Sequence, residues 1–243
     1  MTTKVRTPWH WLPLEARAIP EYVIGTWLTR SPDLERGDGH HVVVIPGFGA
    51  NDRATAPLRK ALTEAGYQCR GWELGRNMGM SKDIGQQLAA GIQQDFESSG
   101  STVSLIGWSL GGVFAREFAR RQPEWIRQVI TLGSPIQDAD HTTIDALFRL
   151  RNPGTPKSVD PDAMAKRREP PPVPCSAIYT RSDGVVPWKA AMEPERPHTR
   201  NVVVSGSHMG LPANPQVWQE CARLLAHPKA MRRTTSKPRR KVS

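Results

Sequence analysis

From residue 40 to residue 227, short apolar runs alternate with longer segments in which apolar residues recur at helical spacing. The short runs predict strands at His41–Ile45, Tyr67–Trp72, Val103–Ile106, Val129–Leu132, Cys175–Tyr179 and Asn201–Val204. The longer segments predict helices, the clearest at Thr55–Ala65, Lys82–Glu97, Leu110–Arg121 and Gln216–Ala226. Apolar strands joined by helices are typical of a parallel sheet that is buried on both faces. We therefore expect an α/β fold with a mostly parallel central sheet of about six or more strands flanked by helices.

Two segments depart from this alternation. Residues 1–38 place several aromatic side chains among prolines, and Ile19–Arg30 has the spacing of a short amphipathic helix, which predicts a leader packed on the domain. Residues 135–174 show no strand pattern and contain a possible helix at Thr142–Leu150. A segment of that length between two strand ends predicts a small cap or lid. The main domain is expected to span residues 39–228.

The net charge of +10 comes from 33 basic and 23 acidic residues, and it is unevenly distributed. Seven of the ten excess charges lie in residues 229–243, which contain no acidic residue. This composition predicts a disordered tail that makes weak, salt-sensitive contact with an anionic surface. The remaining charge is ordinary for a protein surface, so no specific nucleic-acid partner is expected. The oligomeric state is left open.

The chain contains three cysteines, Cys69, Cys175 and Cys221, with no spacing typical of a metal or redox site. They are expected to be buried thiols in a reducing compartment. The first residues lack the uninterrupted apolar segment of a signal peptide, and no stretch approaches the ~18 apolar residues of a membrane span. Together these observations predict a cytoplasmic location.

A candidate nucleophile lies where the third predicted strand meets a predicted helix, in the sequence Gly107-Trp108-Ser109-Leu110-Gly111. A serine on such a sharp turn has a strained backbone, and glycines two residues away on each side leave room for it. The amides at the start of the following helix point toward the same place. The five residues alone fit a nucleophile elbow and an ordinary turn equally well.

A serine needs a histidine to accept its proton and an acid to orient that histidine. Asp183 follows the fifth predicted strand and His208 follows the sixth, so both are expected at the same sheet edge as Ser109. Asp138 or Asp140, after the fourth strand, is the alternative acid.

Other polar residues near strand ends have simpler interpretations. Ser134 also follows a strand, but the proline after it disfavours the backbone of a nucleophile elbow. Ser134 is therefore expected in the floor of the pocket. Arg76 and Asn77 follow the second strand, where they either contact substrate or turn the chain, and the second interpretation is favoured. The six histidines other than His208 are expected to be structural or solvated.

The order of Ser109, Asp183 and His208 resembles that of the α/β-hydrolase superfamily, in particular its lipase-like and esterase-like serine hydrolases. The loop Ile45-Pro46-Gly47-Phe48-Gly49 is similar to the one that supplies an oxyanion donor in lipases, although many of these have His-Gly in place of Pro46-Gly47. The resemblance covers roughly residues 40–227. It implies an oxyanion hole made by the amides of Phe48 and Leu110, and no metal or cofactor.

We therefore expect a serine esterase that cleaves carboxylic esters through an acyl-enzyme intermediate. An acyltransferase or thioesterase would use the same triad, and a non-catalytic binding protein of the same fold is a further alternative. The expected substrate is a small-molecule or lipid-like acyl ester. Trp108, Trp188 and Met209 flank the candidate catalytic residues and predict an apolar acyl pocket.

Overall fold

A computed structural model describes residue 13 and residues 15–27, 33–137 and 161–228. The predicted helix at Thr142–Leu150, the alternative acids Asp138 and Asp140, and the basic tail lie outside these residues. Within the described residues, no helix has the length and apolar character needed to cross a membrane.

The centre of the molecule is a six-stranded sheet in which every recorded strand pair is parallel. The strand order is β2-β1-β3-β4-β5-β6. The strands are β1 (His41–Ile45), β2 (Gln68–Gly71), β3 (Val103–Trp108), β4 (Ile126–Leu132), β5 (Cys175–Thr180) and β6 (Thr199–Val204). The expected α/β fold with a parallel sheet is confirmed. Because all strands run in one direction, the loops after them meet at one edge of the sheet.

The helices are α1 (Ala18–Trp27), α2 (Ala56–Glu64), α3 (Lys82–Ser99), α4 (Leu110–Arg121), α6 (Pro161–Arg168) and α7 (Pro215–Ala226). Short 3-10 turns lie at η2 (Asp52–Thr55), η3 (Pro123–Trp125) and η4 (Leu211–Ala213). Local signals set several ends: Ser81 accepts the amide of Ile84 at the start of α3, and Gly100 ends that helix with a left-handed φ of 62°. Helix α6 lies inside the expected cap segment, at residues for which the sequence pattern predicted no helix.

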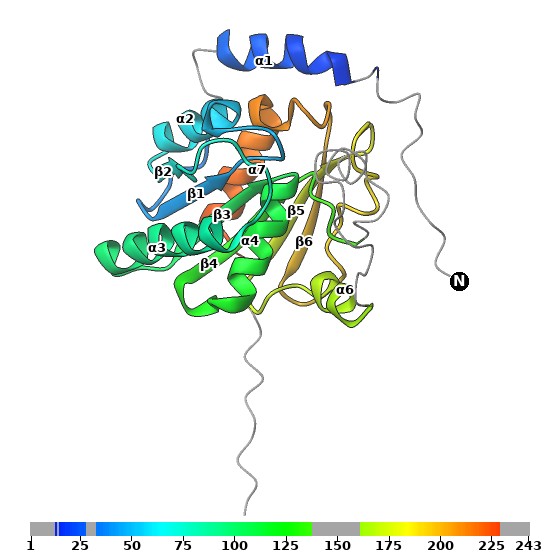
Figure 1. Cartoon of the computed structure of the whole chain (residues 1–243). Coiled ribbons are helices and arrows are strands. Elements are labelled where there is room, and N and C mark those ends of the chain that lie inside the picture. The colour runs from blue at the N-terminus through cyan, green and yellow to red at the C-terminus, as the bar shows by residue number, and fades with distance from the viewer. Residues whose placement is uncertain (1–12, 14, 28–32, 138–160, 229–243) are drawn as a thin grey trace, which may run out of the picture.

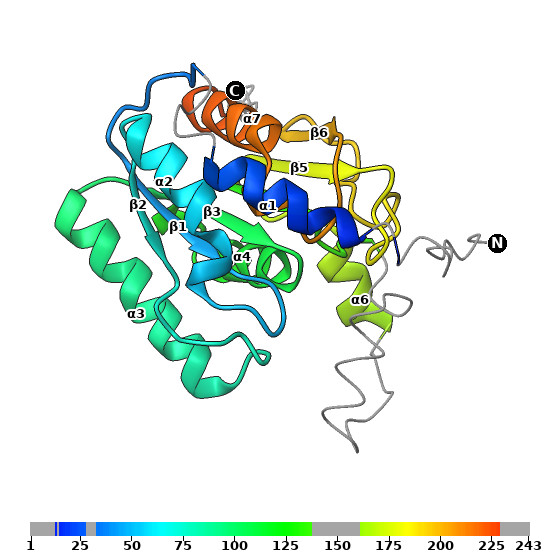
Figure 2. The ribbon, with the colours of Figure 1, turned by 90° about the horizontal axis from the view of Figure 1, so that it is seen from above.

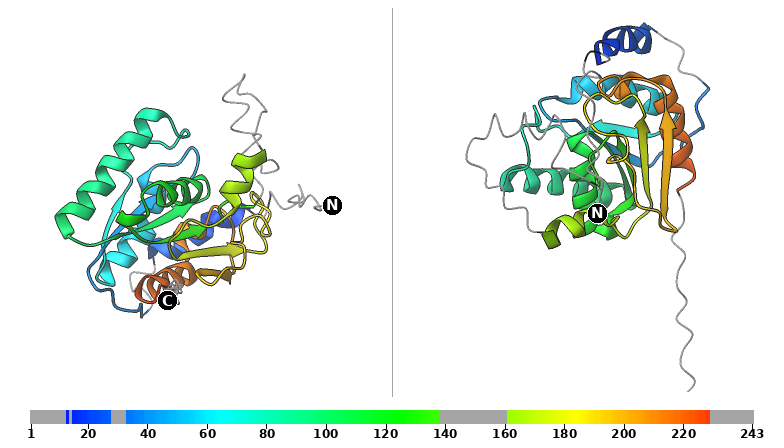
Figure 3. Two further views of the ribbon diagram at one scale, coloured as in Figure 1. Left: turned by 90° about the horizontal axis from the view of Figure 1, so that it is seen from below. Right: turned by 90° about the vertical axis from the view of Figure 1, so that its right-hand side faces the viewer.

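Helices cover both faces of the sheet, as the views from below and from the side show (Figure 3). Alternate residues of β1 contribute to two hydrophobic clusters: Val42 and Val44 pack with α2 and α7, whereas Val43 and Ile45 pack with α3 and α4. Cys175 and Cys221 are buried in these clusters as free thiols. Burial raises the pKa of the third free thiol, Cys69, to about 12. This suppresses its nucleophilic thiolate form at neutral pH.

Helix α1 lies outside the two covering layers and crosses above the sheet (Figures 1 and 2). It packs against η4, which follows the loop after β6. Tyr22 of α1 also donates a hydrogen bond to the carbonyl oxygen of Ala54 in η2. The described part of the N-terminal segment therefore lies over the edge of the sheet where the strands end.

Candidate active site

Ser109 stands at the junction of β3 and α4 with a backbone φ of 53° and ψ of −121°. A Cβ atom at Gly107 would lie 2.3 Å from the Cα of Gly112, and one at Gly111 would lie 2.3 Å from the carbonyl oxygen of Ile45. Both positions therefore require glycine. The turn has the strained, closely packed form of a nucleophile elbow rather than that of an ordinary connection.

The side chains of Ser109, His208 and Asp183 form one continuous chain of close contacts. His208 Nε2 lies 3.1 Å from Ser109 Oγ, and His208 Nδ1 lies 2.7 Å from Asp183 Oδ2. A carboxylate can only accept at that contact, so Nδ1 of the neutral ring carries the proton and Nε2 is left to accept from the serine. All three side chains are buried.

Backbone amides hold Asp183 in its orientation. Its Oδ1 accepts the amides of Val185 and Val186, at 2.8 and 2.7 Å, while Oδ2 faces the histidine. The Asp-x-Val sequence after β5 is thus a turn that fixes the carboxylate toward its neighbour. Burial by itself lowers the pKa of His208, but attraction to Asp183, the hydrogen bond between them and the charge of Glu15 outweigh it and raise that pKa above its usual value.

The loop after β1 lies directly beside the serine. A Cβ atom at Gly47 would be 3.1 Å from Ser109 Cβ, which places the next residue, Phe48, at the elbow. Asn77 is buried behind this loop. Its side-chain Nδ2 donates to the carbonyl oxygen of Pro46 at 2.7 Å, and its backbone carbonyl oxygen accepts the amide of Gly49 at 2.7 Å. Asn77, for which turning the chain was favoured over contacting substrate, therefore holds the predicted oxyanion loop in place.

The residues predicted to contact substrate have different surroundings. Trp108 is buried in the core, and its indole nitrogen donates to the carbonyl oxygen of His208 at 3.1 Å. Trp188 stacks on Tyr179 with a distance of 5.9 Å between ring centroids. Met209 is 44% exposed. Trp108 thus supports the loop that carries His208 through this hydrogen bond. A contact between substrate and any of the three side chains stays a prediction.

Ser134 lies beneath the elbow. It is fully buried and its Oγ donates to the carbonyl oxygen of Gly107 at 3.3 Å. Ser134 Oγ would be 2.0 Å from a Cβ atom at Gly112. Its position is that of a support for the turn, and it does not line the cavity described below.

A second aspartate, histidine and serine group lies at the opposite edge of the sheet. His40 Nε2 is 2.8 Å from Ser104 Oγ, and its Nδ1 contacts the carboxylate of Asp38. Ser104 is fully buried within β3, where an extended strand presents no elbow and leaves no path for a substrate. Burial lowers the pKa of His40, so its ring is neutral beside the Asp38 carboxylate, and the three side chains form a structural hydrogen-bond network.

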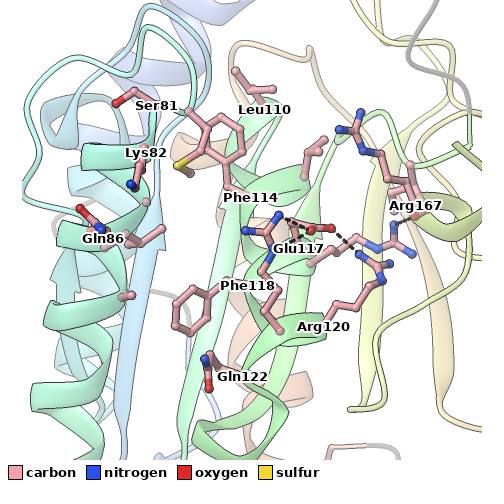
Figure 4. A pocket seen from close by; sticks show the side chains of 18 of the residues that line it. Ser81, Lys82, Gln86, Leu110, Phe114, Glu117, Phe118, Arg120, Gln122 and Arg167 are labelled. Carbon is pink, nitrogen blue, oxygen red and sulfur yellow. Dashed lines mark hydrogen bonds and ion pairs between the residues drawn. The ribbon is translucent and has the colours of Figure 1, made fainter. Parts of the chain in front are cut away.

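A cavity of about 560 Å³ lies between α3 and α4 and reaches Leu110, the residue after the candidate nucleophile (Figure 4). Pro135, Ile136, Arg167 and Arg168 of the expected cap segment also line it. Apolar side chains line much of its wall: Met80, Leu88, Leu110, Val113, Phe114 and Phe118. Trp108, Trp188 and Met209 do not line this cavity, whose walls come mainly from helices α3 and α4.

Sequence reasoning missed the contribution of the N-terminal segment. Glu15 and Glu21 both accept hydrogen bonds from the loop that carries His208. These residues are separated by more than 180 positions in the chain, so no local pattern could indicate the contact.

A parallel sheet with a serine turn after its third strand is typical of the α/β-hydrolase fold, and solved structures of proteins named as lipases and esterases share this fold. A lipase-esterase related protein from Clostridium acetobutylicum superposes with a TM-score of 0.59 at 16% identity, covering 78% of this chain and 96% of that one. The metagenome-derived lipolytic enzymes LipS and LipT are represented by a structure with a TM-score of 0.57 at 14% identity, covering 79% of this chain and 95% of the other.

The chain is also similar in sequence to curated proteins named pimeloyl-[acyl-carrier protein] methyl ester esterase. The relative from Shewanella woodyi is 33% identical over 98 residues, which are 40% of this chain and 37% of that protein. The relative from Aliivibrio salmonicida is 25% identical over 225 residues, covering 69% of this chain and 84% of that protein. The chain thus spans little more than a third of the first of these relatives. No protein-family profile matches it.

Proposed function

We propose that this protein is a serine hydrolase that cleaves carboxylic esters. The observation that carries the proposal is the chain of contacts from Ser109 through His208 to Asp183, with the serine in a strained elbow at the start of α4. A nucleophile, a base and an orienting acid in this order are the elements of acyl transfer through a covalent intermediate. The similarity to proteins named as esterases supports the same reaction class.

In the proposed mechanism, Ser109 Oγ attacks the acyl carbon while His208 Nε2 accepts the serine proton. The amides of Phe48 and Leu110 stabilise the oxyanion, and each such donor contributes on the order of 3 kcal/mol to the transition state. His208 then returns the proton to the leaving alcohol. Water, deprotonated by the same nitrogen, releases the acid and regenerates the serine.

The acyl group is proposed to lie in the cavity between α3 and α4. Leu110 lines that cavity and directly follows the candidate nucleophile, so the carbonyl carbon of the acyl chain is proposed to lie at the Leu110 end of the cavity. The apolar side chains of Phe114 and Phe118 favour an alkyl chain over a charged one along this wall. Methyl esters of carrier-bound acyl chains belong among the substrates to test, because the curated relatives are named for such a substrate.

The proposal predicts turnover of chromogenic acyl esters, with a preference for chains that fill the cavity. The test measures kcat/KM over a series of acyl lengths, for oxygen esters and the matching thioesters, and identifies products with and without a competing alcohol. Preferred release of free acid from oxygen esters would support an esterase. Faster thioester cleavage or transfer to the alcohol would support the thioesterase or acyltransferase alternatives, and absence of all turnover would contradict the proposal.

The raised pKa of His208 predicts the pH dependence of this activity. The histidine accepts a proton only when it is neutral, so kcat/KM should rise with pH through a midpoint above about 6.5, the ordinary histidine pKa, and then level off. The measurement is kcat/KM for a neutral ester at pH values on both sides of that point. A midpoint at or below the ordinary value would show that Asp183 does not act on His208 as proposed.

Two further expectations remain proposals. We propose a cytoplasmic location, which the three free thiols support because a reducing compartment keeps them unpaired. The basic segment 229–243 is proposed to contact anionic surfaces weakly, through charge alone and independently of the hydrolase site.

A further inference from the structure

The carboxylate of Glu15 gathers three backbone amides above the candidate active site. Its Oε1 accepts from Gly184 at 2.8 Å and from His208 at 3.1 Å, while its Oε2 accepts from Met209 at 2.9 Å. Glu15 lies in a short 3-10 turn at residues 15–17, just before α1. A single side chain from the N-terminal segment thus contacts the backbone of the candidate base itself.

These three amides belong to two different loops. Gly184 follows Asp183 after β5, whereas His208 and Met209 lie in the loop after β6. The distance between these loops determines how the Asp183 carboxylate meets the His208 ring. Because an ionised carboxylate forms short, strong bonds with amide donors, Glu15 acts as a bridge between the two loops.

Neighbouring contacts hold the same segment in place. Arg17 Nη2 lies 3.2 Å from Ser182 Oγ in the loop of the acid, and Glu21 accepts the amide of Ser207 at 3.0 Å in the loop of the histidine. Figure 2 shows α1 crossing above the sheet where these loops emerge. Thr180 and Ser182 also join the two loops directly by donating to the carbonyl oxygen of Gly206, at 2.9 and 3.0 Å, whereas Glu15 contacts the backbone amide of His208 itself.

Building on the proposed hydrolase function, we infer that Glu15 is a positioning residue, which holds His208 between Asp183 and Ser109 by bridging the acid loop and the histidine loop. The N-terminal segment is then part of the active site rather than a leader packed on its flank. A displacement of about 1 Å in a reacting group can lower a rate about 100-fold, so small movements of the histidine loop matter.

The charge of Glu15 also acts on His208, in addition to its hydrogen bonds. The charged groups that raise the pKa of His208 are Asp183, at the end of β5, and Glu15, from the N-terminal segment. Removing the charge of Glu15 should therefore lower that pKa, in addition to loosening the loop. A residue that merely packed the helix against the domain would not change the ionisation of the ring.

The test compares the full-length protein with Glu15→Gln and with Glu124→Gln, which makes the same chemical change at an exposed position in η3. An amide at position 15 has one acceptor oxygen and no charge, so it cannot keep all three bonds. We expect kcat to fall about 10- to 100-fold with little change in KM, and the acid limb of the pH profile to move to lower pH. Glu124→Gln should leave both unchanged.

The readouts separate this inference from the proposed function. Titration of the His208 ring by NMR needs no turnover, so a lower ring pKa in Glu15→Gln would support the contact even if no ester is cleaved. Active wild-type protein with unchanged kinetics and an unchanged titration in Glu15→Gln would overturn the inference and leave the hydrolase intact. Loss of the cooperative unfolding transition in Glu15→Gln would also overturn it, because Glu15 would then hold the fold rather than the histidine.

Discussion

Replacing Ser109 by alanine is expected to lower kcat by at least about three orders of magnitude and to abolish labelling by a fluorophosphonate probe. The Ser109 hydroxyl lies within hydrogen-bonding distance of His208 Nε2, at 3.1 Å. Alanine keeps the Cβ atom and the backbone turn, so the protein should fold and keep its cavity. Labelling and ester turnover are measured on the same preparations.

Ser104→Ala provides the matched control, because Ser104 also contacts a histidine that is paired with an aspartate. It should label and turn over substrate as the wild type does, since Ser104 is buried at the other edge of the sheet. Loss of its bond to His40 should cost about 1 to 3 kcal/mol of unfolding free energy. Undiminished labelling of Ser109→Ala would rule out the nucleophile proposed here.

Asp183→Asn is expected to lower kcat by about four orders of magnitude while the protein stays folded. The asparagine carbonyl oxygen can still accept the amides of Val185 and Val186, so the turn is preserved. Its NH₂ group must then face His208 Nδ1. That contact forces the ring proton onto Nε2, where it blocks acceptance of the serine proton. Steady-state kinetics and the midpoint of denaturant unfolding together distinguish loss of catalysis from loss of the fold.

The alternative acids supply the comparison for this variant. Asp138→Asn and Asp140→Asn should retain turnover close to that of the wild type, because the histidine already has its carboxylate partner in Asp183. Full activity in Asp183→Asn, together with a large loss of activity in Asp138→Asn or Asp140→Asn, would show that the acid paired with His208 is one of those two residues and not Asp183.

The sheet was predictable from the chain because a strand buried on both faces must be apolar, and the glycine-flanked serine was predictable because its constraint is local. At β2, the predicted strand included Tyr67 and Trp72, whereas the ladder spans only Gln68–Gly71. Those two aromatic residues are buried in the two opposite clusters, and their apolar character reflects packing rather than strand pairing.

Helix α6 was not predicted because it lacks an apolar stripe. Its last turn consists of Lys166, Arg167 and Arg168, which interact favourably with the helix dipole. Arg116 of α4 donates to the carbonyl oxygen of Arg167 at 2.7 Å, so tertiary contacts reinforce this end of the helix. Periodicity alone therefore carried no signal for it.

The sequence did not indicate a structural partner for Trp108. Its position beside Ser109 predicted a substrate contact, which stays a prediction, and the structure shows its buried indole donating to the carbonyl oxygen of His208. Asn77 is a second case, since a residue expected to turn the chain holds the loop of Phe48. In both cases the partner lies in the loop that follows another strand.

The sequence by itself determined the parallel α/β sheet, the strained serine turn and the edge at which Ser109, Asp183 and His208 meet. These follow from periodicity, from the steric demands of Gly107 and Gly111, and from the common direction of parallel strands. Only the tertiary structure decided the place of the apolar cavity and the bridge formed by Glu15. Both depend on contacts between segments far apart in the chain, whose formation is set by how the whole domain packs rather than by any local pattern.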